Sequence, residues 1–172
     1  MTGILDLQLW QILLAVFAMM HITLLAVTVY LHRFSAHKAL ELNPVLQHFF
    51  RFWLWLSTGM GTKAWTAIHR KHHAKCETEE DPHSPVVLGL KTVLFKGVAL
   101  YRRSSTDEVL QQYGKGTPDD FIEKNLYTRF SKLGLLLMFI IDIVLFGAAG
   151  VWVWIMQMLT VPLLAAGVFN SR

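Results

Sequence analysis

The chain has few charged residues and a single cysteine. Only 16% of its 172 residues are charged, whereas 53% are hydrophobic and the mean hydropathy is +0.40. A soluble domain usually contains about 25% charged residues. Cys76, being alone, cannot form an intramolecular disulfide or a site made of several thiolates. The composition therefore excludes both an ordinary soluble domain and a disulfide-stabilised one.

Basic residues are missing from two long parts of the chain. Lys and Arg occur between Arg33 and Lys132 and again at Arg172, but residues 1–31 and 133–171 contain none. Basic residues concentrated between apolar spans are typical of the cytoplasmic side of a membrane protein. This segregation explains the pI of about 9.3, and we expect no nucleic-acid partner.

Two long apolar stretches predict membrane-spanning helices. Residues 7–31 contain no charged side chain, and about 20 apolar residues suffice to cross a bilayer core. Residues 133–169 contain Asp142 as their only charge and are long enough for two short crossings joined by a turn at 147–150. Because an ionisable residue inside a span is costly, we expect Asp142 and His21 to hydrogen-bond between helices.

Residues 45–61 form a shorter aromatic stretch that contains His48 and Arg51. If this stretch crossed the membrane, the histidines before and after it would lie on opposite sides. We therefore expect an interfacial or re-entrant helix here and a cytoplasmic helical segment over 63–132. The sequence predicts an all-α membrane protein, a helical transmembrane bundle formed as a single domain over 1–172 by one N-terminal span, this interfacial helix and a C-terminal helical hairpin.

Five of the eight histidines occur in two short groups. The second group, His69-Arg-Lys-His72-His73, places three imidazoles on one face of a helix, because positions i, i+3 and i+4 are neighbours. Imidazole is a ligand for Fe, Zn, Cu and Ni. The acidic run 77–81 that follows could orient the imidazoles by accepting their other N–H, or could simply end a solvated helix. A basic surface helix that happens to contain histidines is the alternative interpretation.

The first group, His32-Arg-Phe-Ser-Ala-His37, does not fit one face of an α-helix, because five residues correspond to about 140° around the axis. The two imidazoles can still converge if His32 ends the membrane helix and His37 lies in the turn after it. Alternatively, they are polar caps at the membrane surface. Two histidine groups expected on the same side of the membrane favour a shared, nitrogen-rich metal site.

With Trp65 before the second group and Asp81-Pro-His-Ser-Pro85 after it, the pattern resembles the membrane fatty-acyl desaturases, most closely bacterial members related to acyl-CoA and acyl-lipid delta-9 desaturases. The resemblance implies four membrane helices and a non-haem di-iron (Fe) centre on the cytoplasmic side of an inner membrane. It implies that dioxygen and two electrons remove two hydrogens from an acyl chain. The partners implied are the lipid bilayer, a fatty-acyl-CoA or acyl-lipid substrate, and an electron donor of the ferredoxin, rubredoxin or cytochrome type.

The resemblance also assigns roles to individual residues. It makes Trp65 part of the acyl tunnel, unless the ring serves packing alone, and it places Asn170 near the metal. The iron ligands that it implies are His32, His37, His69, His72 and His73.

The third histidine box of the family does not occur before Arg172. We therefore expect a C-terminally incomplete desaturase that binds at most one iron and is inactive as it stands. Two alternatives stay open at this point: a membrane hydroxylase with similar histidine boxes, and a membrane metal-binding protein without catalysis.

Overall fold

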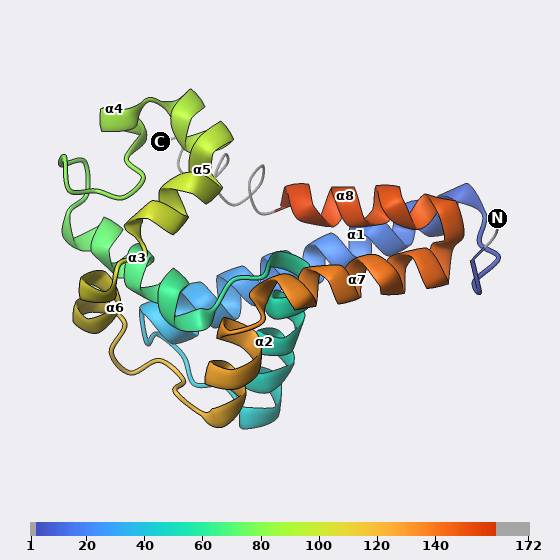
Figure 1. The fold of residues 1–172 in the computed structure, drawn as a ribbon, viewed down its shortest axis with the longest axis horizontal. Helices are drawn as coiled ribbons and strands as arrows, with labels where there is room; N and C mark the ends of the chain where they lie inside the picture. The colour runs from blue at the N-terminus through green and yellow to red at the C-terminus, as the bar shows by residue number, and fades with distance from the viewer. Residues whose placement is uncertain (1–2, 161–172) are drawn as a thin grey trace.

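The computed structural model describes residues 3–160, in which helices joined by turns and loops are the regular structure and no strand occurs (Figure 1). The all-α class predicted from the sequence is confirmed. Asn170 lies outside the described residues. The helices in chain order are α1 (Leu9–Leu25), η1 (Ala26–Ala36), α2 (Pro44–Thr58), α3 (Thr62–Ala74), α4 (Pro85–Leu88), α5 (Leu90–Ser104), α6 (Asp107–Tyr113), η2 (Glu123–Thr128), α7 (Ser131–Phe146), η3 (Gly147–Ala149) and α8 (Gly150–Thr160).

Two stretches are long and apolar enough to cross a membrane, Leu9–Ala36 and Ser131–Thr160. The first joins α1 and η1 without a break, so the predicted span continues past residue 31. The second reverses direction at Gly147, whose φ of 62° is accessible to glycine at little cost. α7 and α8 therefore lie antiparallel beside α1 (Figure 1), which confirms the predicted C-terminal hairpin.

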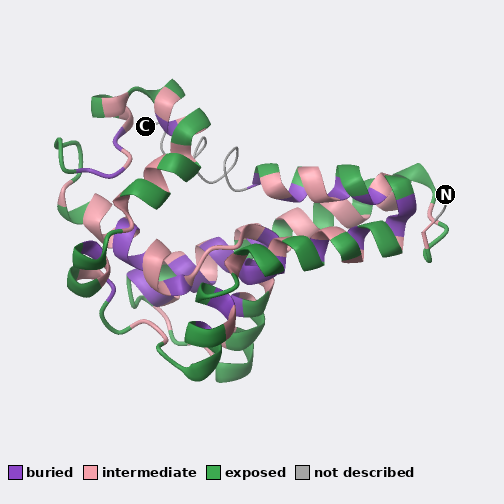
Figure 2. Ribbon diagram, viewed as in Figure 1, coloured by how far each residue is buried: buried purple, intermediate pink, exposed green. Residues whose placement is uncertain are grey.

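Many large apolar side chains on α1, α7 and α8 are exposed, among them Leu13, Phe17, Leu136 and Trp152. The outer surface of this three-helix bundle is largely exposed or half-buried, whereas the buried residues gather where η1, α2 and α3 meet (Figure 2). Extended apolar surface on a folded protein marks contact with another apolar phase. This surface, together with the two spans, indicates association with a membrane.

The polar residues of the spans behave differently from one another. The Nε2 amide of Gln157 in α8 donates to the Oδ2 of Asp142 in α7 over 3.0 Å, and both side chains are buried. The predicted hydrogen bond between helices is therefore present for Asp142. The same prediction was wrong for His21, which is exposed and whose Nδ1 lies 2.8 Å from the carbonyl of Phe17 in its own helix.

α2 occupies the place of the predicted interfacial helix. It begins after Asn43, whose side chain caps the helix by accepting from the N–H of Val45, and it ends at Gly59 with a φ of 64°. In Figure 1 it runs steeply across the direction of the three-helix bundle and packs on the start of α7. Its outer face exposes Phe49 and Phe52. An interfacial position in the bilayer stays a prediction.

The predicted cytoplasmic segment contains α3, α4, α5, α6 and η2. α3 packs on η1 along one side and on α6 along another. The main hydrophobic core lies beneath η1, where Tyr30 and Leu31 contact Leu54 of α2. This packing holds η1 and α3 side by side, and the two histidine groups lie at the ends of these two helices.

Candidate metal centre

η1 is wound as a π-helix, in which the backbone N–H bonds to the carbonyl five residues earlier. The N–H of His37 donates to the carbonyl of His32 over 3.0 Å, so residues five apart lie one above the other. The imidazole centroids of His32 and His37 are consequently 4.5 Å apart. An α-helix would separate these side chains by about 140° around its axis, but the wider π winding brings them together. His32 lies near the end of the long first helix and His37 follows η1 directly, so the convergence expected as one of the two alternatives is present.

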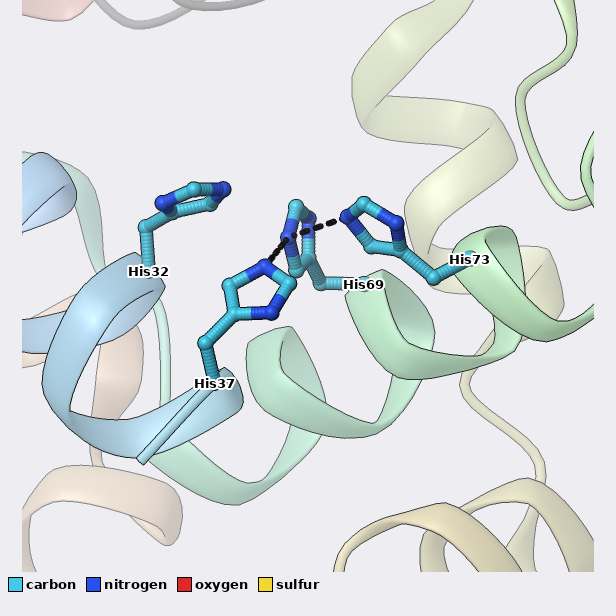
Figure 3. A group of neighbouring side chains, drawn as sticks. All are labelled: His32, His37, His69 and His73. Atoms are coloured by element: carbon cyan, nitrogen blue, oxygen red, sulfur yellow. Dashed lines mark hydrogen bonds between the residues drawn. The ribbon is translucent and has the colours of Figure 1, made fainter. Parts of the chain in front are cut away.

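The second histidine group lies on α3. His69 and His73 are one helical turn apart, and their Nε2 atoms are separated by 3.1 Å. The Nε2 of His37 lies 3.3 Å from that of His69 (Figure 3). One nitrogen from each of four imidazoles falls within 4.8 Å of the others, and this group, called here the four-histidine cluster, consists of His32, His37, His69 and His73.

η1 and α3 are joined by buried polar contacts below the cluster. The hydroxyls of Tyr30 and Thr62 lie 3.3 Å apart, and those of Ser35 and Thr66 lie 2.7 Å apart. In these pairs the residue number increases on both helices in the same direction, so η1 and α3 run parallel. The next pair in this series is His37 with His69. The cluster therefore lies at the end of an interface whose register is fixed by specific hydrogen bonds.

The distances within the cluster suit a transition-metal ion. Two imidazole nitrogens bound to one ion at about 2.1 Å lie about 3.0 Å apart at a right angle and about 3.4 Å apart at a tetrahedral angle. The two Nε2 separations, 3.1 and 3.3 Å, fall between these values. His37 and His73 are exposed while His32 and His69 are half-buried, so the cluster opens to solvent on one side. The donor set therefore fits a metal.

Burial and neighbouring imidazoles favour the neutral form of His69 and His73, and metal binding requires neutral imidazole. Burial, followed by the neighbouring imidazoles of His73, His32, His37 and His72, lowers the pKa of His69 to about 2. Burial, followed by His37 and His72, also lowers the pKa of His73. Protonating one of these rings would place a positive charge among the others. The lone pairs of His69 and His73 are therefore available at neutral pH.

His72 does not join the four-histidine cluster. Its Nδ1 lies 2.8 Å from the carboxylate of Asp81, and its ring stacks on that of His83 with centroids 4.3 Å apart. Burial raises the pKa of Asp81, but hydrogen bonds from His72 and from the N–H groups of His83 and Glu77 outweigh it and lower the pKa overall. Asp81 thus holds His72 by one ring nitrogen, which is the first of the two alternatives left open for the acidic run.

His83 lies in the Asp-Pro-His segment, but no role was predicted for it from the sequence. Burial, followed by the imidazole of His72, lowers the pKa of His83 to about 4. His72, Cys76 and Asp81 also offer ligand atoms within 4.8 Å of one another. Because Asp81 already accepts three hydrogen bonds, we interpret this second group as the support of His72.

Trp65 stacks face to face on His69, with ring centroids 4.6 Å apart and planes at 14°. It precedes His69 by one turn of α3 and packs against the core under η1. The ring therefore covers one face of a cluster imidazole. A position along an acyl tunnel stays a prediction. An open apolar hollow of about 480 Å³ lies near Gly3 and Gly147, at the far end of the three-helix bundle from the cluster.

An ion-pair network around the buried side chain of Arg51 fixes the start of α3 and was not predicted from the sequence. Arg51 of α2 donates to Asp120 over 2.7 Å and to Glu123 over 3.1 Å. The other carboxylate oxygen of Glu123 accepts from the N–H of Thr62, the first residue of α3, over 3.1 Å. Burial raises the pKa of Glu123, although Arg51 opposes that shift. This network anchors the helix that carries His69 and His73.

Comparisons of the chain with a family model and with curated proteins point to the same family. The family model for fatty acid desaturases matches residues 8–172. Among curated proteins of Arabidopsis thaliana, the chain is 32% identical over 78 residues to a chloroplastic palmitoyl-monogalactosyldiacylglycerol delta-7 desaturase. It is 34% identical over 61 residues to delta-9 acyl-lipid desaturase 1.

These matches cover 45% and 36% of this chain, and 21% and 20% of the two relatives, so the matched part spans about a fifth of their length. No solved structure matches the chain significantly. A family match over nearly all residues, carrying both histidine groups, identifies the chain as a member of the fatty acid desaturase family.

Proposed function

We propose that this chain carries the iron-binding histidines of a membrane fatty-acyl desaturase. The observation that carries the proposal is the four-histidine cluster, in which imidazoles from two separate helices converge. In this proposal His32, His37, His69 and His73 hold one iron. His72, oriented by Asp81, serves the second iron of the di-iron centre that the family resemblance implies. Asn170 belongs to the same proposal as a residue near the metal.

Iron, when bound, supplies the activation of dioxygen that removal of hydrogen from an unactivated C–H bond requires. The overall reaction converts a –CH2–CH2– unit, dioxygen, two electrons and two protons into a –CH=CH– unit and two waters. The protein's own part is to keep His69 neutral, to fix the positions of the imidazoles from η1 and α3, and to shield one face of His69 with Trp65.

The relatives are named for lipid-linked acyl chains, which supports a fatty-acyl substrate for this chain. We propose that the chain forms one membrane domain, with the cluster on the cytoplasmic side of a bacterial inner membrane and with reducing equivalents supplied by a ferredoxin, rubredoxin or cytochrome. The basic residues between the two spans support this orientation. An acyl-CoA and an acyl-lipid are both compatible with the proposal.

Metal content tests the proposal directly. We expect the purified chain, loaded with Fe(II) without oxygen, to retain about one iron, because the four-histidine cluster brings four imidazole nitrogens together, whereas the carboxylate of Asp81 in the second group already accepts hydrogen bonds. His69→Ala should lose that iron, since His69 contacts both His37 and His73. His48→Ala, an exposed histidine on α2, is the matched control and should retain it. Equal iron in His69→Ala and the unchanged chain would contradict the proposal.

Product analysis then separates desaturation from hydroxylation. The chain is expressed in a lipid-producing host together with a ferredoxin reducing system, and the acyl chains are analysed by mass spectrometry. A gain of alkene that His69→Ala abolishes supports a desaturase, whereas a gain of alcohol would assign the cluster to hydroxylation. Retained iron without either product is the outcome expected if the chain binds metal but is inactive by itself.

A further inference from the structure

Arg70 lies between two histidines in the sequence of α3, and all of its hydrogen bonds end on backbone carbonyls. Its Nε donates to Ala36 over 3.0 Å, and its Nη2 donates to Ser35 over 2.8 Å. Its Nη1 donates to Tyr113 over 3.0 Å and to Lys115 over 2.7 Å. One guanidinium thus connects α3 with the end of η1, with the last residue of α6 and with the segment after it.

The end of η1 needs such a donor. The last carbonyls of a helix have no N–H partner within the helix, and a positive charge at that end is favourable. Ser35 and Ala36 are the last two residues of η1, and both are buried. Arg70 satisfies both carbonyls at once. The next residue in the chain is His37, which belongs to the four-histidine cluster.

We propose that Arg70 is a positioning residue that fixes His37 against His69. This proposal rests on the proposed function. It states that Arg70 fixes how the two histidine groups are placed relative to each other. The guanidinium holds the peptide immediately before His37 and is itself carried by the residue after His69. The hydrogen bond between Ser35 and Thr66 fixes the register of the two helices, and the guanidinium of Arg70 fixes the peptide that carries His37.

A lysine cannot replace the guanidinium of Arg70 in these hydrogen bonds. The guanidinium is planar and presents several N–H groups in fixed directions, whereas the lysine ammonium is a compact point charge on a flexible stem. Arg70→Lys keeps the positive charge and removes the fixed geometry. Arg102→Lys is the matched control, because Arg102 is exposed on α5. Neither residue is a proposed metal ligand.

The first measurement uses the metal-free chain in detergent micelles. Hydrogen exchange is followed in the peptide covering residues 32–39, which contains the N–H groups of His37 and Ala39 that bond back into η1. We expect at least several-fold faster exchange there in Arg70→Lys, no change in α1, and no change anywhere near η1 in Arg102→Lys. Unaltered exchange over residues 32–39 would overturn the proposal.

The second measurement adds Co(II) as a spectroscopic probe. Changing a group that orients metal ligands typically lowers metal affinity about 10-fold to 100-fold. We expect a loss in this range for Arg70→Lys, together with a changed visible absorption spectrum of the bound cobalt. Faster exchange with unchanged cobalt affinity and spectrum would mean that Arg70 only stabilises the fold, which also overturns the proposal.

Failure of the proposed function has a different signature. If the unchanged chain binds no Co(II), the metal-site proposal fails, while the exchange of residues 32–39 still decides whether Arg70 holds the peptide before His37. Poor folding is addressed with Arg70→Ala and free guanidinium at millimolar concentration, with methylammonium as control. Protection from exchange that guanidinium restores and methylammonium does not would support the role of the planar guanidinium of Arg70. No recovery with guanidinium would count against that role.

Discussion

At the scale of single residues, charged side chains away from the histidines determine how the site is held. Arg51 is only 9% exposed, yet two carboxylates contact it. Removing one partner of a buried charge is costly because the other charge stays uncompensated. The hydrogen bonds from Arg51 lower the pKa of Asp120 to about 2 from its ordinary 3.8. This shift makes stability depend on pH.

Asp120→Asn should remove a pH-dependent part of the stability. A carboxylate with a lowered native pKa stabilises the fold above its unfolded pKa and loses that effect as pH falls from about 4 to about 2. Because Asp120 is 48% exposed, solvent screening keeps the effect below about 1 kcal/mol. The difference in free energy of unfolding between the unchanged chain and the variant should therefore be visible at pH 6 and vanish near pH 2.

Unfolding of both proteins in micelles, followed by circular dichroism across this range, checks the prediction. Asp119→Asn is the control, since Asp119 is exposed and pairs with exposed Lys124. It should change the free energy of unfolding less than Asp120→Asn at pH 6. A pH-independent difference for Asp120→Asn would show that the carboxylate charge is not what matters.

At the scale of helices, close contacts between elements place α2 and the hairpin. Gly134 of α7 is buried, and a Cβ at this position would overlap the carbonyl oxygen of Trp55 and lie 2.7 Å from a ring atom of the same residue. Trp55 in turn donates from its indole N–H to the carbonyl of Phe130 over 3.0 Å. The approach of α2 to α7 therefore depends on the absence of a side chain at Gly134.

Gly134→Ala should destabilise the protein by about 1–3 kcal/mol, because added volume forces a well-packed interface apart. Gly97→Ala in α5 is the matched control, since nothing lies within 4 Å of the added Cβ. Alanine there should stabilise the helix by about 0.5–1 kcal/mol. Denaturant unfolding of the two variants should thus shift in opposite directions, and equal shifts would contradict the contact.

The hairpin offers a second prediction at this scale. Gln157→Leu leaves the buried carboxyl of Asp142 without its hydrogen-bond donor. We expect the free energy of unfolding, measured in SDS, to fall by about 1–2 kcal/mol. Replacing both residues by leucine removes the unpaired carboxyl and should recover most of the loss. A double variant as unstable as Gln157→Leu would show that Asp142 is not the cause.

At the scale of the whole molecule, the cluster and the hairpin turn lie at opposite ends of the three-helix bundle (Figure 1). η1 carries His32 at one end of the long first helix. Ile4 and Leu5, before that helix begins, bond to carbonyls of Val144 and Leu145 beside the turn. If the bundle crosses the bilayer, the two ends face different compartments.

Labelling with a membrane-impermeant maleimide tests this arrangement. Native Cys76 is exposed and serves as the first probe. In the Cys76→Ser background, Ala39→Cys should be labelled from the same side as Cys76, while Ala148→Cys at the exposed turn should be labelled from the other side. Labelling of positions 39 and 76 from opposite sides would be incompatible with one shared metal centre.

The sequence by itself determined the helical class, the two apolar stretches, the hairpin turn and the identity of the histidines. These features follow from local composition and spacing, since an uncharged apolar run favours a membrane helix, and a glycine pair favours a turn, independently of tertiary contacts. The resemblance in the histidine groups and the Asp-Pro-His segment was enough to predict the family, which the family model confirms.

The sequence predicted that the two histidine groups converge, but only the tertiary structure decided which four of the five imidazoles form the cluster and how they meet. The π winding of η1 brings His37 over His32, and no periodicity rule based on α-helices contains that geometry. Asp81 turns His72 away from the other four histidines, although all three histidines on α3 share one face in sequence terms. Arg70 joins carbonyls more than 30 residues distant from it. Such contacts depend on how helices pack, and packing is a property of the whole fold rather than of any segment.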